Sequence, residues 1–83
     1  MIEITKTLNH VDMNIMEFLH KAVKIDKYNR IANAITQQGL WGDETALTHY
    51  LGKRDDESIV HYLQIDFKEH DSLYIVVEQD ELQ

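Results

Sequence analysis

Hydrophobic and polar residues alternate along two parts of the chain, one near each end. Residues 2–8, IEITKTL, alternate in this way and are rich in β-branched side chains, so they predict a short strand. Lys6 interrupts the apolar face of that strand, which favours a position at the edge of a sheet. Residues 58–67, SIVHYLQIDF, and 73–79, LYIVVEQ, also alternate, and the turn-like KEHDS separates them. The C-terminal third therefore predicts an antiparallel β-hairpin.

The segment that follows the first strand has the spacing of an α-helix instead. Within residues 9–25, apolar side chains recur at intervals of three and four and form one stripe. The residues of this stripe are Ile15, Phe18, Leu19, Ala22 and Val23. We expect Asn9 or Asp12 to cap the start of the helix by accepting backbone N–H bonds.

Two further helices are predicted before the hairpin. Residues 26–39 carry an apolar stripe between a capping Asp26 and a terminating Gly39. Residues 43–52, DETALTHYLG, begin with a capping aspartate, place apolar residues at helical spacing and end at Gly52. We therefore predict a short third helix over this segment.

These elements define an α+β fold with the order β-α-α-α-β-β. We expect a three-stranded antiparallel sheet with the helices packed on one face. The 83 residues form a single small domain, in which residues 79–83 are predicted to be a frayed tail.

The charge of the chain is strongly uneven. The formal net charge is −7. Residues 1–54 carry seven Lys and Arg against six Asp and Glu, whereas residues 55–83 carry nine Asp and Glu against Lys68 alone. The hairpin and its flanks therefore hold the whole imbalance, and such a segregation concerns partners more than fold.

An acidic hairpin with tyrosines on its outer face predicts a surface that binds a cationic protein partner. Tyrosines provide contact area at low entropic cost, and carboxylates steer encounter with basic surfaces. The expected partner-binding residues are Asp55, Asp56, Glu57, Tyr62, Asp66, Tyr74, Glu78, Asp80 and Glu81. We expect the two acidic groups that flank the hairpin to meet at one end of the sheet. The leading hypothesis is a small acidic protein-binding module, and its sharper form is an inhibitor that imitates nucleic acid. The alternative is that these charges only keep the sheet face solvated.

The sequence allows two other functions. The order of elements is similar to that of small phage repressors of the Cro type, which implies a helix-turn-helix made by residues 26–39 and 43–52. The predicted recognition helix, however, begins with two acids, and a net charge of −7 disfavours binding along a nucleic-acid backbone. The third hypothesis is a structural or assembly subunit that forms a homodimer by pairing of sheet edges.

Catalysis, metal binding and membrane insertion have little support in the sequence. The chain has no cysteine and no nucleotide-binding or nucleophile motif, and its glycines stand where turns need them. The five histidines are scattered, and none is paired at helical spacing: His10, His20, His49, His61 and His70. We expect His61 to be a hydrogen-bonded, partly buried side chain on the inward face of its strand, and we expect neither a cofactor nor a metal. No apolar run approaches the ~18 residues of a membrane span, and no signal peptide is apparent, so the expected location is cytoplasmic.

Overall fold

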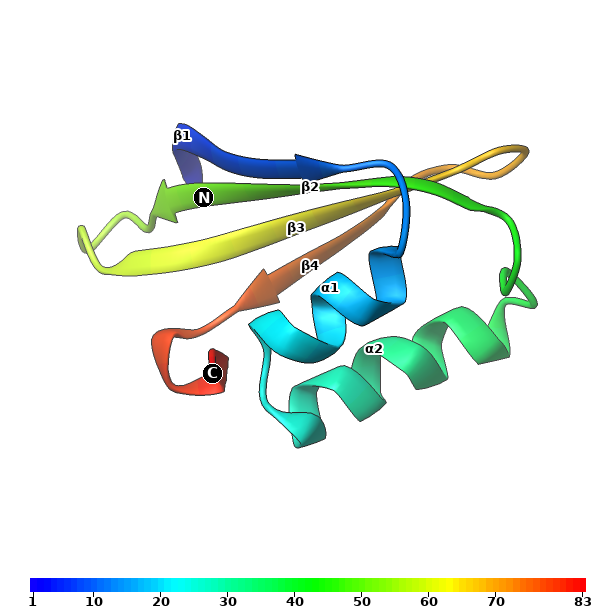
Figure 1. The fold of residues 1–83 in the computed structure, drawn as a ribbon. Helices are drawn as coiled ribbons and strands as arrows, with labels where there is room; N and C mark the ends of the chain where they lie inside the picture. Colours follow the sequence, from blue (N-terminus) through cyan, green and yellow to red (C-terminus); the bar gives the residue numbers. More distant parts are fainter.

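The computed structural model describes residues 1–83, which form a four-stranded antiparallel sheet with two helices on one face (Figure 1). In chain order the elements are β1 (Glu3–Val11), α1 (Ile15–Ala22), α2 (Ile25–Gln37), β2 (Glu44–Lys53), β3 (Ile59–Phe67), β4 (Leu73–Val77) and a short 3-10 helix, η1 (Gln79–Glu81). The strands lie in the order β1-β2-β3-β4, so each strand pairs with the next one along the chain. The α+β class, the edge position of the first strand and the C-terminal hairpin are confirmed.

The predicted third helix over residues 43–52 is wrong, and the expected three-stranded sheet was short by one strand. These residues form β2, and the element order is β-α-α-β-β-β. The sequence of this segment fits the period of a helix and also that of a strand, because Leu47, His49 and Leu51 alternate as they would on one face of a strand. Strand formation wins because β2 lies between two neighbours and pairs with β1 on one side and β3 on the other. Threonine and tyrosine at its other positions also favour a strand.

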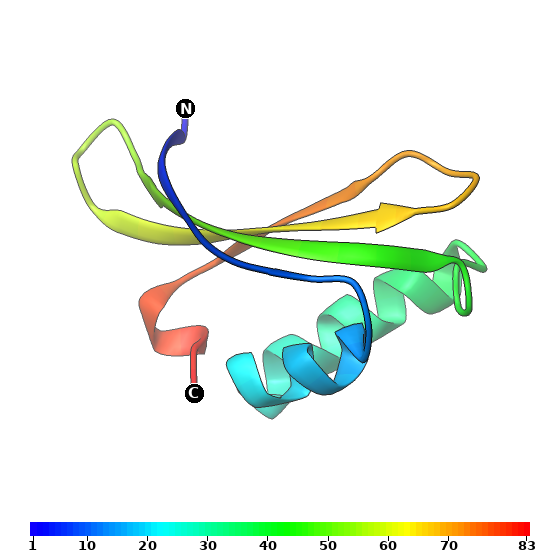
Figure 2. The same ribbon diagram turned by 45° about the horizontal axis from the view of Figure 1, so that its top comes forward.

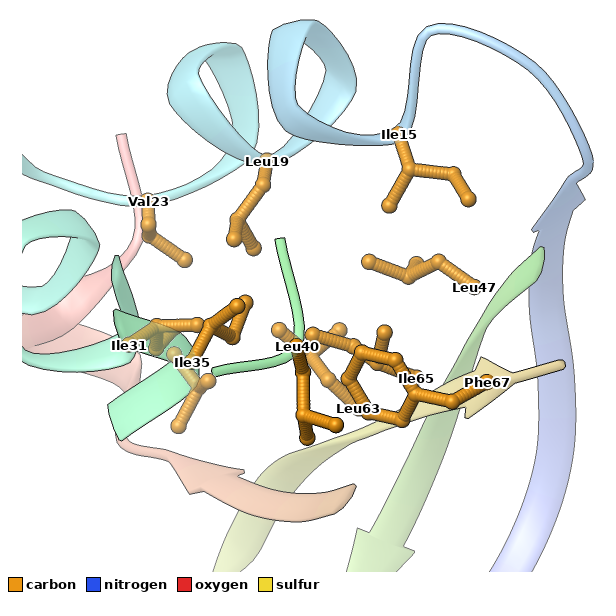
Figure 3. Close-up of a cluster of buried hydrophobic side chains, with 11 residues drawn as sticks. Ile15, Leu19, Val23, Ile31, Ile35, Leu40, Leu47, Leu63, Ile65 and Phe67 are labelled. Carbon is orange, nitrogen blue, oxygen red and sulfur yellow. The ribbon is translucent and has the colours of Figure 1, made fainter. Parts of the chain in front are cut away.

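The core lies between the helices and the sheet (Figure 3). Helix α1 contributes Leu19 and α2 contributes Ile35, and both are fully buried. From the sheet, Leu47 and Ile65 are opposite one another in the β2–β3 register and are equally buried. The full cluster comprises Ile15, Leu19, Val23, Ile31, Ile35, Leu40, Leu47, Leu63, Ile65, Phe67 and Val77. The helices therefore cover one face of the sheet.

The helix starts differ from those predicted. Neither Asn9 nor Asp12 caps α1, because β1 continues to Val11; the N-cap is Asn14, in the left-handed region at φ 56°. The N-cap of α2 is Lys24 rather than Asp26. Neither cap makes a side-chain hydrogen bond.

The end of α2 follows the prediction. Gly39 adopts φ 67°, the left-handed conformation that favours glycine. This turn brings Leu40 back onto the helix, where its backbone N–H donates to the carbonyl oxygen of Ile35 at 3.1 Å. The Leu40 side chain is then buried in the core.

Gly52 does not end a helix but allows β1 to approach β2 closely. It lies opposite Ile4 in the register. A Cβ atom at this position would lie 2.9 Å from Cγ2 of Ile2 and 3.1 Å from the backbone oxygen of Glu3. The absence of a side chain therefore fixes how the N-terminal half of β1 lies on the sheet.

Residues 79–83 are folded back against the helices and are not the frayed tail that was predicted. The backbone N–H of Lys24 donates to the carbonyl oxygen of Glu81 at 2.8 Å, and that of Gln83 donates to the carbonyl oxygen of Ala22 at 3.1 Å. Leu82 forms an isolated bridge with Val23. As Figure 2 shows, the C-terminus lies on the helix side of the sheet and the N-terminus on the other side.

Candidate protein-docking surface

The sheet face opposite the helices is open and carries three tyrosines. In β3, Tyr62 and Gln64 occupy this face because the residues between and beyond them point into the core. The register places Tyr50 of β2 opposite Tyr62, and Tyr74 of β4 opposite Gln64. The alternation of three neighbouring strands thus gathers three aromatic side chains on one surface.

These tyrosines line a hollow of about 680 Å³, which we call the tyrosine hollow. The residues that line it are Met1, Ile2, Ile4, Tyr50, Tyr62, Gln64, Tyr74 and Val76. The ring centroids of Tyr62 and Tyr74 are 5.9 Å apart, with an angle of 52° between the ring planes. Tyr74 is 57% exposed and Ile4 is 45% exposed, so an apolar and aromatic surface faces solvent here. Its volume is within the range of ligand pockets in proteins.

A chain of hydrogen bonds runs from the tyrosine hollow to Asp66. The hydroxyl of Tyr50 donates to Oε1 of Gln64 at 3.2 Å, and Nε2 of Gln64 donates to Oδ1 of Asp66 at 2.8 Å. The hydroxyl of Ser72 donates to the same oxygen of Asp66 at 2.6 Å. The bond from Ser72 first, and then that from Gln64, lower the pKa of Asp66. Its second oxygen, Oδ2, accepts no hydrogen bond from the protein.

The predicted partner-binding residues do not all lie on one surface. Tyr62, Tyr74 and Asp66 lie on the open face, as the alternation of the hairpin indicated. The carboxylate of Glu78 instead forms a two-pronged pair with the guanidinium of Arg54, and this bond is the first cause of the lowered pKa of Glu78. The same pair raises the pKa of Arg54. Glu78 is therefore engaged within the molecule.

Glu81 is also paired internally. Its carboxylate lies 3.4 Å from Nζ of Lys27 and 3.9 Å from Nη1 of Arg30, both on α2. It also accepts the backbone N–H of Glu78 at 2.9 Å. Only 22% of the Glu81 side chain and 14% of the Lys27 side chain are exposed. Lys27 and Arg30 of α2 are therefore paired with this carboxylate within the molecule.

The other predicted acidic residues are exposed, three of them in the turn between β2 and β3 and Asp80 in η1. Asp55 pairs with the N-terminal amine at 3.2 Å, with both groups exposed. Asp56 accepts hydrogen bonds from the side chain and the backbone N–H of Ser58, which lower its pKa. Glu57 and Asp80 are exposed and form no ion pair. Glu81 faces α2 and so does not join the acidic residues of this turn.

Two histidines form a hydrogen-bonded pair on the helix side of the sheet. Nε2 of His49 lies 2.8 Å from Nδ1 of His61, so one ring donates and the other accepts. Burial is the first cause of a lowered pKa in both. The expectation that His61 is a partly buried, hydrogen-bonded residue is confirmed; it is 9% exposed. No three His, Asp or Glu residues are grouped so that they could hold a metal ion.

Sequence reasoning missed Tyr50, Gln64 and the N-terminal wall of the hollow. Tyr50 lies in the segment that the sequence predicts as a third helix, and this helix does not form. The usable signal was the alternation across residues 44–53, which places Tyr50 on the face of a strand opposite to that of Leu47. The helix-turn-helix hypothesis loses its second helix for the same reason.

No protein-family model matches the chain, and neither a curated protein nor a solved structure is significantly similar to it. Neither α1 nor α2 is long and apolar enough to cross a membrane.

Proposed function

We propose that the protein is a small acidic binding module that docks through the open face of its sheet onto a basic surface of a partner protein. The observation that carries this proposal is the tyrosine hollow, whose lining residue Gln64 is hydrogen-bonded to the carboxylate of Asp66. The helices cover the opposite face, so this is the sheet face that remains for a partner.

The chemistry of the open face suits an interface. Tyrosine is enriched in the buried centres of protein interfaces, since its ring is rigid and its hydroxyl still finds a hydrogen-bond partner. Tyr62 and Tyr74 supply exposed ring surface, while Gln64 and Asp66 supply polar groups whose positions are already fixed by hydrogen bonds. A surface whose side chains are ordered before binding loses less entropy on association.

The net charge of −7 favours a basic partner. Electrostatic attraction accelerates encounter between oppositely charged surfaces and is weakened by salt. In the sharper form of the proposal, the module inhibits its partner by covering a surface that handles nucleic acid. The exposed carboxylates of Asp56, Glu57 and Asp80 would then occupy positions that phosphates otherwise take.

Affinity capture from the native host, followed by mass spectrometry, tests the proposal. The wild-type protein and the double variant Tyr62→Ala/Tyr74→Ala are compared after circular dichroism has shown that both are folded. We expect the wild type to retain a protein with a basic surface and the double variant to lose it. Equal capture by the two proteins would show that the open face is not the docking surface.

Charge reversal and changes in salt concentration then test whether electrostatic attraction accelerates association with the partner. Replacing Asp56, Glu57 and Asp80 by lysine should slow association with the captured partner by about tenfold at low ionic strength and flatten its salt dependence. An unchanged association rate would remove the electrostatic part of the proposal.

A further inference from the structure

We infer that the tyrosine hollow receives an arginine side chain of the partner, whose guanidinium lies against Tyr62 and Tyr74 and donates to Oδ2 of Asp66. This inference rests on the proposed function and specifies the group that the open face recognises. It follows from the hydrogen-bonding state of the side chains around the hollow.

Gln64 lines the hollow and Asp66 adjoins it through its hydrogen bond with Gln64, and both side chains offer acceptors that are still free. Oδ1 of Asp66 already accepts from Gln64 and Ser72, whereas Oδ2 accepts from no group in the protein. Oε1 of Gln64 accepts only the hydroxyl of Tyr50, although a carbonyl oxygen has two lone pairs. The group that best complements these free acceptors is a cation with several hydrogen-bond donors. No lysine or arginine of the protein itself lines the hollow.

The walls of the hollow favour a guanidinium over an ammonium. Seven of its eight lining residues are hydrophobic, counting the tyrosines, so an entering cation loses water. A guanidinium is more weakly hydrated than an ammonium and stacks its plane on aromatic rings. It also has five donors in a fixed fork, which lets one group serve both Asp66 and Gln64.

A second copy of the chain is a poorer occupant of the same surface. In a two-fold dimer that buries the open face, each copy presents the same patch, so Asp66 of one copy approaches the equivalent region of the other. Both copies also carry a net charge of −7. Like charges across such an interface oppose association, whereas a cationic partner relieves them.

The experiment compares two short basic peptides that differ only in having arginine or lysine at every cationic position. Their binding to the whole chain is followed by NMR shifts of the backbone amides and tyrosine rings. We expect the arginine peptide to bind about tenfold more tightly than the lysine peptide, with the largest shifts at Tyr62, Tyr74 and Asp66. Asp66→Asn should remove most of this preference. The charge-matched control Asp12→Asn, at an exposed residue outside the open face, should retain it.

The outcomes separate this inference from the function on which it rests. If both peptides bind equally and Tyr62→Ala weakens both, the open face binds cations but the preference for arginine is refuted. If the shifts map to residues 55–57 instead, the docking surface and the inference are both wrong. If neither peptide binds, the inference is overturned, and the capture experiment with the tyrosine variants still decides the proposed function.

Discussion

Replacing Gly52 with alanine should destabilise the fold, although alanine is normally the better residue within a strand. The added Cβ would lie 2.9 Å from Cγ2 of Ile2 and 3.1 Å from the backbone oxygen of Glu3. Carbon atoms in ordinary contact are ~3.5–4.0 Å apart, so β1 must move away by roughly half an ångström. Ile2 can rotate, but the backbone of Glu3 cannot.

Two effects compete, and their magnitudes decide the sign. Overpacking of a close contact costs ~1–3 kcal/mol, whereas removing a glycine from a strand interior gains ~0.5–1 kcal/mol. We therefore expect a net loss of about 1 kcal/mol. In a domain of this size, this corresponds to a lowering of Tm by about 4–8 °C. Because Ile2 also lines the tyrosine hollow, the same change should shift the NMR signals of the hollow.

Urea unfolding of Gly52→Ala and Gly52→Val provides the assay. Valine has the higher strand propensity, so a mechanism based on propensity predicts that valine is the more stable variant. Steric crowding predicts the opposite order, with valine worse than alanine. Adding Ile2→Ala to Gly52→Ala should recover part of the loss, as expected for residues in contact. A Gly52→Ala protein as stable as the wild type, or more stable, would refute the close approach of β1 to β2.

Three further predictions concern pH, the C-terminal segment and the tryptophan. Burial lowers the folded-state pKa of His49 and His61 below the ordinary value of 6.5, so their contribution to stability is present above about pH 6.5 and lost as pH falls below it. The urea midpoint should be lower at about pH 5.5 than at about pH 7.5, and a flat profile would contradict this. Glu81→Gln should lower the free energy of unfolding by about 1 kcal/mol and speed amide exchange at the C-terminus. The control Glu17→Gln, which removes an exposed ion pair, should change stability little. Equal effects of the two substitutions would show that the C-terminal segment is not docked. Trp41 is 45% exposed and should be accessible to a soluble fluorescence quencher, so full protection would place it in the core.

Local patterns in the sequence were sufficient for the elements whose environment is simple. The strand at residues 2–8, the helical stripe around Leu19 and the hairpin were all predicted by one clear period. Residues 43–52 carry two periods at once, and the choice between them depends on hydrogen bonding to strands elsewhere in the chain. That information is non-local. The same error hid Tyr50 and therefore the central wall of the candidate site.

The acidic surface shows a similar limit. The alternation of the hairpin places Tyr62 and Asp66 on its outer face. It does not show that Glu78 pairs with Arg54, 24 residues away, or that Glu81 turns toward α2. Such pairs depend on how the elements pack, and a count of charges along the chain cannot reveal them.

Internal pairing changes the role of these acids without cancelling their effect on a partner. Each internal pair engages a cation together with an anion, so the net charge of −7 remains and still acts at distances comparable to the Debye length of ~8–10 Å. Glu78 and Glu81 should therefore influence how fast a basic partner arrives while making no contact with it. Asp66, with its free oxygen beside the tyrosine hollow, should instead influence how long the partner stays. The acidic composition and the tyrosines thus serve different steps of one binding reaction, and the location of a carboxylate in the fold decides which step it affects.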